Sequence, residues 1–329
     1  MSDPIHVAVI YKKNWKFLLK DYRDNTQHYF FMHALNRNKE LSVEFFPSEN
    51  EFDIKSLKNN FDIILLPDNS TINIPEKFLN IKESKIPVIA RTGDPHTIFR
   101  DNRLDFHKSH RVKSYFGPMT TEYFHKFYPK NFNFKYILAG LEPQLYKKCK
   151  PFEERISDKI LNSGNVGNSK LKSRIANAII NPKKSSWYFY KLRTKCNNLS
   201  YVDYSGFSNG KFINEDYPSY VSQYKSAIAA SRFYAVIKYL ELTSAGCLTF
   251  MEVSDDNLDA IKLGFIDGKN SIFINEKNYK NKFKEFLNDP ENSDWKKIAN
   301  AGRKHSLENL NNDVAVKILV KLIKETIDT

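Results

Sequence analysis

The sequence predicts an α/β fold of two domains, each built around a parallel sheet, and three observations lead to this prediction. Short apolar runs that fit buried strands alternate with segments of helical spacing. A second series of the same kind begins at Lys159, after a charged stretch around Pro151 that is typical of a linker. A chain of 329 residues is long enough for two cores. We therefore expect an N-terminal domain at 1–146 and a C-terminal domain at 147–329.

Buried strands of the first domain are expected where apolar residues run together. These runs are 6–11, 41–46, 61–67, 86–91, 111–118 and 133–138. Helices are expected at 26–36, 75–82 and 119–127. Strands that alternate with helices form parallel sheets covered on both faces, and their ligands bind beyond the carboxyl ends of the strands.

The turn that leaves the strand at 86–91 contains our candidate catalytic residues. Gly93 permits a tight turn and Pro95 fixes the backbone, so Asp94 and His96 stay near the carboxyl edge of the sheet. His96 can act as a general base or bind a hydroxyl group, with Asp94 orienting it. The alternative is an ordinary Asp-Pro surface turn with a solvated histidine.

The second domain is expected to begin with a strand at 159–163 and a glycine-containing turn. Gly164 and Asn165 lie in this turn, which opens a helix at 170–180 whose backbone N–H groups can face a phosphate or the acceptor. Two glycines at this spacing match no stringent nucleotide motif, so a plain loop is equally consistent. Further helices are expected at 217–224, 257–262, 283–288, 293–305 and 314–327, and the last of these can cross back to the first domain.

An aromatic run at 187–190 precedes three cations, Lys191, Arg193 and Lys195. Aromatic rings interleaved with cations can stack on bases or on sugars. Core packing beside a basic surface explains the same pattern, and we prefer that interpretation.

A βαβ unit in the second domain organises the predicted ligand site. It consists of a strand at 227–230, a helix that ends at Ala245 and Gly246, and a strand at 247–251. Lys238 supplies a cation, and Glu241, one turn further on, supplies a carboxylate that can accept two hydroxyl hydrogen bonds. A helix that begins beside the carboxyl end of a strand also offers unpaired N–H groups. This combination suits a nucleoside diphosphate and its ribose.

Other charged residues of this region have two interpretations. Arg232 is a second candidate cation for the diphosphate, although Lys and Arg on helices are usually solvated. Glu252, Asp255 and Asp256 form a carboxylate cluster that suggests a divalent metal. Their spacing matches no metal loop, and an acidic cap of the following helix explains them more simply.

The segment at 238–248 resembles the donor-binding signature of group 1 glycosyltransferases, nearest to their CgeB-like, spore-maturation branch. The segment at 263–273 is similar to that family's downstream glycine-containing loop and strand, and the segment at 298–303 to its late helix. Tyr234 stands where many group 1 enzymes carry a second glutamate, seven positions before Glu241. We place Tyr234 among the donor-binding positions on that basis.

The resemblance implies the GT-B arrangement, in which two Rossmann-like domains face each other across a cleft. It implies a metal-independent sugar transferase whose only co-substrate is a nucleotide-sugar, with no cofactor. In this scheme Glu241 binds the ribose, and Lys238, Arg232 and the turn at Gly164 and Asn165 bind the diphosphate. The first domain binds the acceptor, with His96 and Asp94 nearest the chemistry. The acceptor is a glycan, a lipid-linked sugar or another molecule.

Composition narrows the class of protein further. The net charge of +13 favours anionic partners, and 41% hydrophobic residues exclude general disorder. The sequence contains no signal-peptide pattern and no membrane-length apolar run, so we expect a cytoplasmic protein, or one peripheral to a membrane surface. Two alternatives remain: a nucleic-acid or polyanion-binding protein, including a DNA-glycosylating enzyme, and an inactive GT-B protein that binds carbohydrate.

Overall fold

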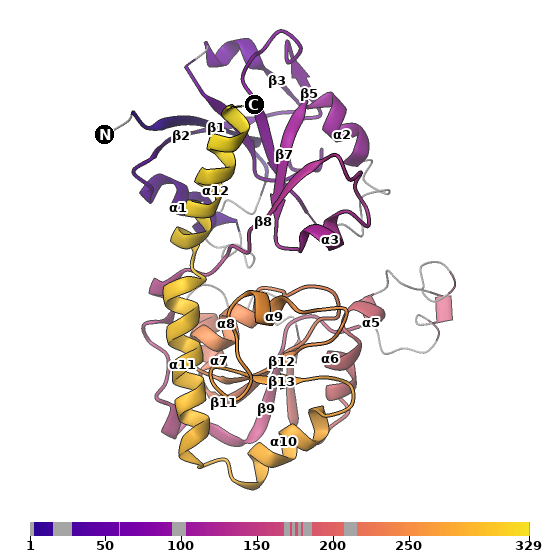
Figure 1. Cartoon of the computed structure of the whole chain (residues 1–329), viewed down its shortest axis with the longest axis vertical. Coiled ribbons are helices and arrows are strands. Elements are labelled where there is room, and N and C mark those ends of the chain that lie inside the picture. The colour runs from indigo at the N-terminus through magenta and orange to yellow at the C-terminus, as the bar shows by residue number, and fades with distance from the viewer. Residues whose placement is uncertain are drawn as a thin grey trace. The chain divides into compact units, whose positions relative to one another are not determined.

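The computed structural model divides the chain into two compact units (Figure 1). The structure describes residues 3–15, 28–58, 60–93, 103–167, 172, 175, 176, 179, 186–206 and 216–328. Unit 1 comprises 1–140 together with 312–329, and unit 2 comprises 141–311. The division thus lies at 140/141, where the sequence placed the boundary at 146/147.

Unit 1 is built on a six-stranded parallel sheet in the order β2-β1-β4-β6-β7-β8. The strands are β1 (Ile5–Lys12), β2 (Leu41–Ser48), β4 (Ile63–Leu66), β6 (Val88–Arg91), β7 (Val112–Gly117) and β8 (Asn133–Tyr136). Each coincides with a predicted apolar run. Such runs form the central strands of a parallel sheet because both faces of the sheet are covered.

The helices of unit 1 cover this sheet. They are α1 (Tyr29–Arg37), α2 (Arg103–Ser109), α3 (Thr121–Phe124), α12 (Asn312–Ile327) and a 3₁₀ turn at Ile54–Leu57. The amphipathic helix α12 packs its apolar side on α1 and β7, and Leu319 and Ile323 are fully buried there. A hydrogen bond of 3.0 Å joins Ser114 of β7 to Thr326 of α12. The last helix therefore belongs to unit 1, although the segment before it belongs to unit 2.

The helix predicted for 75–82 is wrong. Lys77–Leu79 forms the short strand β5, which pairs in parallel with β3 (Glu51–Asp53). Asn80 ends this strand with a positive φ of 58°, and its side chain donates to Asp53 Oδ1 at 2.8 Å. The apparent helical spacing arose because a strand and a left-handed asparagine turn place apolar residues three and four positions apart.

Unit 2 is built on a five-stranded parallel sheet in the order β10-β9-β11-β12-β13. The strands are β9 (Ile156–Ser163), β10 (Val202–Gly206), β11 (Tyr224–Ala229), β12 (Leu248–Glu252) and β13 (Ile272–Ile274). The predicted βαβ unit is present, because β11 and β12 are neighbours and α8 (Lys238–Ser244) connects them. β10 was not predicted, because it is a short edge strand whose residues are mostly polar.

The remaining helices of unit 2 follow the predicted pattern in most places. They are α5 (Ser186–Phe189), α6 (Lys191–Cys196), α7 (Asp216–Val221), α9 (Asp259–Lys262), α10 (Tyr279–Asn288), α11 (Ser293–Asn309) and 3₁₀ turns at Pro143–Tyr146 and Phe152–Glu154. The helix predicted at 170–180 falls largely outside the described residues. Phe250, Phe283 and Phe286 form the centre of the core between the sheet and α10.

Candidate functional site

The candidate site lies at the carboxyl edge of the unit 2 sheet. All five strands are parallel, so the ends of β9, β11 and β12 lie along one edge. Gly164 directly follows β9, and Lys238 begins α8, which follows β11. The fold thus brings together two residues that are 74 positions apart in the sequence.

Lys238, Glu241 and Tyr217 form a buried polar cluster at this edge. The Nζ atom of Lys238 donates to Glu241 Oε2 at 2.5 Å and to the Tyr217 hydroxyl at 2.6 Å. Nζ also lies 3.9 Å from the centre of the Tyr217 ring, and the Tyr217 hydroxyl lies 3.1 Å from Ser163 Oγ at the end of β9. The side chains of Lys238 and Glu241 are only 18% and 5% exposed, so the ion pair is shielded from solvent screening.

The electrostatics of this cluster keep Lys238 charged. Burial lowers the pKa of the Lys238 ammonium, but Glu241 and Tyr217 outweigh this effect and the pKa lies above its usual value. Burial raises the pKa of Tyr217, which Lys238 partly offsets, so the phenol keeps its proton. The cluster therefore presents a fixed cation at the edge of the sheet.

Gly164 permits the close approach of two cations. Its φ is +95°, which disfavours any residue with a Cβ atom. A Cβ atom built there would lie 2.9 Å from Arg193 Nη2 and 3.1 Å from Lys238 Cε. We name Gly164, Arg193 and Lys238 the cation site.

Arg193 is the residue of the cation site that the sequence analysis missed. Its side chain is 1% exposed, and its Nε atom donates to Asn162 Oδ1 at 2.9 Å. Its Nη2 atom is buried and has no hydrogen-bond partner within the described part of the chain. A buried donor without an acceptor is costly, and native proteins contain few of them. An anion beside Gly164 would supply the missing acceptor.

No sequence pattern sets Arg193 apart, because it stands between Lys191 and Lys195 in a basic run. Those two lysines are partly exposed and form ion pairs of 2.8 and 2.7 Å with Glu276. Leu192 and Cys196 are fully buried and mark the inner side of α6. Only the burial of Arg193 in the folded chain distinguishes it from the two surface lysines.

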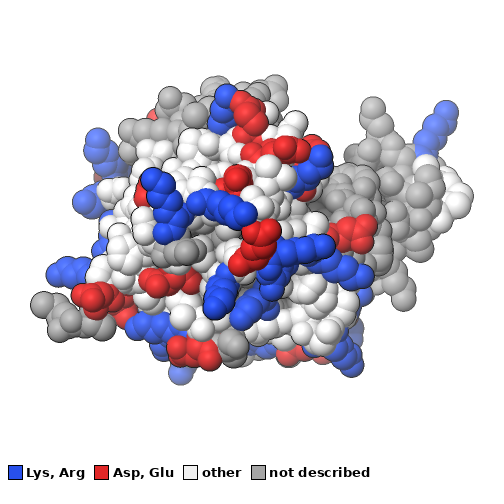
Figure 2. Space-filling view, turned by 90° about the horizontal axis from the view of Figure 1, so that it is seen from above, with Lys and Arg blue, Asp and Glu red and all other residues white. Residues whose placement is uncertain are grey.

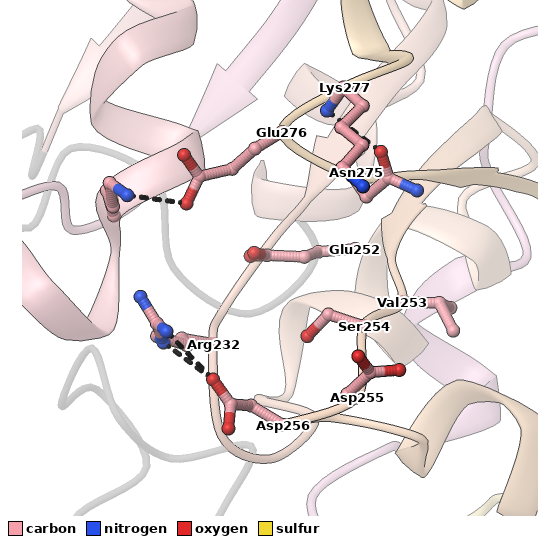
Figure 3. Close-up of a pocket in the computed structure, with 10 residues that line it drawn as sticks. Arg232, Glu252, Val253, Ser254, Asp255, Asp256, Asn275, Glu276 and Lys277 are labelled. Carbon is pink, nitrogen blue, oxygen red and sulfur yellow. Dashed lines mark hydrogen bonds and ion pairs between the residues drawn. The ribbon is translucent and has the colours of Figure 1, made fainter.

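Arg232 does not join the cation site. Its Nε and Nη2 atoms each donate to Asp256 Oδ2 at 2.9 Å, and its guanidinium stacks 4.2 Å from the centre of the Tyr188 ring. The cap predicted at Asp255 and Asp256 is wrong, because Asp256 pairs with Arg232 and α9 begins only at Asp259. Arg232 instead lines a separate pocket at the ends of β12 and β13 (Figure 3).

The other predicted positions of unit 2 have different surroundings. Tyr234 is buried against Phe189 with ring centres 5.1 Å apart, so it belongs to the core. Asn165 is exposed next to Gly164. The first N–H groups of α8, at Tyr239, Leu240 and Glu241, donate to the carbonyl groups of Val236 and Ile237. The chain itself thus uses three of the N–H groups that we expected to face a phosphate.

The predicted catalytic residues Asp94 and His96 lie outside the described residues, but the start of their turn is described. The N–H group of Gly93 donates to Asn69 Oδ1 at 3.0 Å. Asn69 is fully buried and donates to the Tyr128 hydroxyl at 2.6 Å. A buried asparagine after β4 therefore fixes the backbone that leaves β6.

Among the described residues, no group of three or more His, Cys, Asp or Glu side chains could hold a metal ion. Within the same ranges, no helix has both the length and the apolar character needed to cross a membrane.

Comparison with known proteins shows the fold. No family model matches this chain, and no curated protein matches it in sequence. Among solved structures, sucrose-phosphate synthase from Thermosynechococcus elongatus is similar with a TM-score of 0.58 at 12% identity, over 98% of each chain. HepE from Anabaena, in complex with UDP and glucose, is similar with a TM-score of 0.55 at 10% identity, over 98% of this chain and 100% of that one.

A third similar structure is an α-glucosyltransferase in complex with UDP-glucose and DNA containing an abasic site. Its TM-score is 0.57 at 11% identity, over 98% of this chain and 99% of that one. These identities are too low to carry over a substrate or a residue role. They confirm the predicted fold class: the chain has two Rossmann-like domains, as in glycosyltransferases of the GT-B type.

Proposed function

We propose that this protein is a glycosyltransferase that moves a sugar from a nucleoside diphosphate donor to an acceptor. The observation that carries the proposal is the cation site, where Arg193 Nη2 is buried without an acceptor beside Gly164 and Lys238. Several solved structures of the same fold contain UDP or UDP-glucose, which makes UDP the first nucleotide to test.

In this proposal the cation site binds the diphosphate. When the bond between the sugar and the diphosphate breaks, negative charge grows on the leaving oxygen. Arg193 and Lys238 are held in place before the reaction, by Asn162 and Glu241 respectively, so they stabilise that charge without reorganising. Two fixed cations supply the charge that a divalent metal would otherwise supply. We therefore propose that transfer needs no metal.

Glu241 has two tasks in this scheme. It orients and charges Lys238 through the 2.5 Å hydrogen bond, and it remains the predicted ligand of the ribose. Asp94 and His96 remain the proposed catalytic pair of the acceptor side, where His96 would take the proton of the attacking hydroxyl.

The experiment is a thermal-shift titration with UDP, GDP, ADP, dTDP and CMP, without metal and then with magnesium. Nucleotide at 100 times its dissociation constant stabilises the protein by about 2.7 kcal/mol. We expect one nucleotide to stabilise the wild type without metal and to lose this effect in Arg193→Met. The matched control is Lys195→Met on the same helix, because Lys195 pairs with Glu276 at the surface.

A nucleotide that stabilises Arg193→Met as much as wild type would contradict the cation site. Release of UDP from UDP-sugars separates an active transferase from an inactive sugar-binding protein of the same fold, because enzymes of this kind hydrolyse their donor slowly without an acceptor.

Polyanion binding is the less favoured function. Figure 2 shows a face on which Lys and Arg alternate with Asp and Glu, without a continuous basic surface. Several lysines of unit 1 form ion pairs, such as Lys55 with Glu83 at 2.8 Å and Lys77 with Glu51 at 3.0 Å. DNA or heparin could stabilise the protein only at low salt while no nucleotide stabilises it. That result would replace our proposal with polyanion binding, because counterion release makes such binding salt-dependent.

A further inference from the structure

A second pocket lies at the carboxyl ends of β12 and β13. Its volume is about 350 Å³, within the size range of small-molecule sites. Glu252, Arg232 and Glu276 line it, and none of the residues of the cation site does. Because the sheet is parallel, the pocket opens at the same edge as the cation site.

Glu252 is a buried carboxyl group aimed into this pocket. Its side chain points into the space between Glu276 and Arg232 (Figure 3). It is 6% exposed, and its Oε2 atom is buried with no hydrogen-bond partner among the residues that the structure describes. Such an oxygen costs free energy unless a ligand or water satisfies it.

Two of the cations that line the pocket with Glu252 are already paired, and a third, Lys277, is exposed. Arg232 binds Asp256 at 2.9 Å, and Lys191 binds Glu276 at 2.8 Å. Burial, followed by the charge of Glu276, raises the pKa of Glu252 to about 7, although Arg232 and Lys191 act in the opposite direction. The carboxyl group is therefore partly protonated near neutral pH, and it can both donate and accept hydrogen bonds.

These features select the chemistry of the ligand. An anion would meet Glu252 and two further aspartates in the lining, Asp255 and Asp256. A metal ion is disfavoured because the described acidic side chains form no group of three with suitable geometry. A neutral polar molecule with several hydroxyl groups satisfies the free carboxyl oxygen and also meets the polar atoms of Ser254 and Asn275.

We propose that this pocket binds the ring of a neutral hexose, with Glu252 hydrogen-bonded to its hydroxyl groups. The ring belongs either to the glycosyl group of the donor or to a separate sugar, since both have the same chemistry. The inference deepens the proposed function and rests on it only for the choice between these two sources.

The test compares wild type with Glu252→Gln and Glu252→Leu by calorimetric titration. The ligands are UDP, UDP-glucose, UDP-galactose and UDP-N-acetylglucosamine, and then free glucose, galactose and mannose. Glu285→Gln is the control, because Glu285 is an exposed carboxylate on α10 paired only loosely with Lys282 at 3.4 Å. Leucine in place of a buried carboxyl group leaves no unsatisfied polar atom, so Glu252→Leu is expected to fold.

If the ring is part of the donor, one UDP-sugar binds the wild type more tightly than UDP does. Glu252→Leu then lowers the affinity for that UDP-sugar by about tenfold or more and leaves the affinity for UDP unchanged. If the ring is a separate sugar, a free hexose binds the wild type and loses affinity by about the same factor in Glu252→Leu, whereas all UDP compounds are unaffected.

Three results overturn the inference. In the first, the wild type binds no free hexose and binds no UDP-sugar more tightly than UDP. In the second, Glu252→Leu keeps the wild-type affinity for the sugar or UDP-sugar, and in the third it loses affinity equally for UDP and for UDP-sugars. The proposed function fails separately. If hexose binding depends on Glu252 and no nucleotide binds, the hexose-binding inference stands and the proposed glycosyltransferase function is wrong.

Discussion

The Nζ atom of Lys238 lies 2.5 Å from Oε2 of Glu241, one turn further along α8. Both side chains are largely buried, and the same ammonium group donates a second hydrogen bond of 2.6 Å to the hydroxyl oxygen of Tyr217. An ion pair of this kind is not a source of stability in itself, because desolvation offsets its attraction. It is costly to break, because the remaining charge stays buried without a partner.

We predict that Lys238→Met lowers the free energy of unfolding by about 3 kcal/mol, because Glu241 is left as an uncompensated buried carboxylate. The double variant with Glu241→Gln should recover part of this loss, because it removes both charges. Urea denaturation of the wild type, both single variants and the double variant measures the coupling. A double variant no more stable than Lys238→Met would mean that the pair is not coupled as the structure indicates.

A second prediction concerns Gly164, which has a φ of +95° and lies close to Arg193. A control variant separates the effect of backbone strain from the effect of displacing Arg193. Gly164→Ala adds left-handed strain, roughly 1 kcal/mol, and a Cβ atom that displaces the Arg193 guanidinium. Gly268→Ala adds the same kind of strain at φ +70°, with nothing within 4 Å of the new atom. Gly164→Ala should lose at least as much stability in urea as Gly268→Ala, because its Cβ atom also meets the buried Arg193. Only Gly164→Ala should lose nucleotide binding, and equal affinities would argue against the cation site.

The pH dependence of the free energy of unfolding should show the titration of Glu252. Its pKa is raised from 4.5 to about 7 in the folded protein, so the folded state holds the proton more tightly than the unfolded state. Stability therefore falls as pH rises from about 4.5 to about 7, by up to about 3 kcal/mol, and the loss is complete above pH 7. The charges that face this carboxyl group are those of Glu276, Arg232, Lys191 and Asp256.

Glu252→Gln should remove this fall, because glutamine does not titrate. Urea denaturation of both proteins between pH 5 and pH 8 tests the expectation. The variant should equal or exceed the wild type in stability at pH 8. Parallel pH profiles for the two proteins would show that Glu252 titrates as an ordinary carboxyl group.

Gly302 gives a prediction about the packing of α11 on the α8 layer. A Cβ atom there would lie 2.3 Å from the carbonyl oxygen of Asn270 and 2.8 Å from Thr243 Cγ2. Gly302→Ala should destabilise the protein by about 1–3 kcal/mol through overpacking, although alanine is the better helix former. Asn300→Ala, at an exposed position of the same helix, should be neutral or slightly stabilising. A stabilised Gly302→Ala would place α11 further from Asn270.

The sequence alone determined the six-stranded sheet of unit 1, the βαβ unit at the centre of the unit 2 sheet, and the choice of Gly164, Lys238 and Glu241 as residues of one sheet edge. Buried strands are read from apolar runs, and the edge at which parallel strands end follows from their direction. The same local patterns failed at 75–82, where a strand and a left-handed Asn80 imitate helical spacing.

Only the tertiary structure decided which cation faces the glycine turn. Arg193 and Arg232 look alike in sequence, but α6 turns Arg193 inward beside Gly164, whereas Asp256 and Tyr188 hold Arg232 at another pocket. Likewise, Glu252 looked like part of an acidic cap until β12 placed it in the pocket with its Oε2 atom unpaired. Burial and hydrogen-bond partners depend on distant segments, so no local pattern contains them.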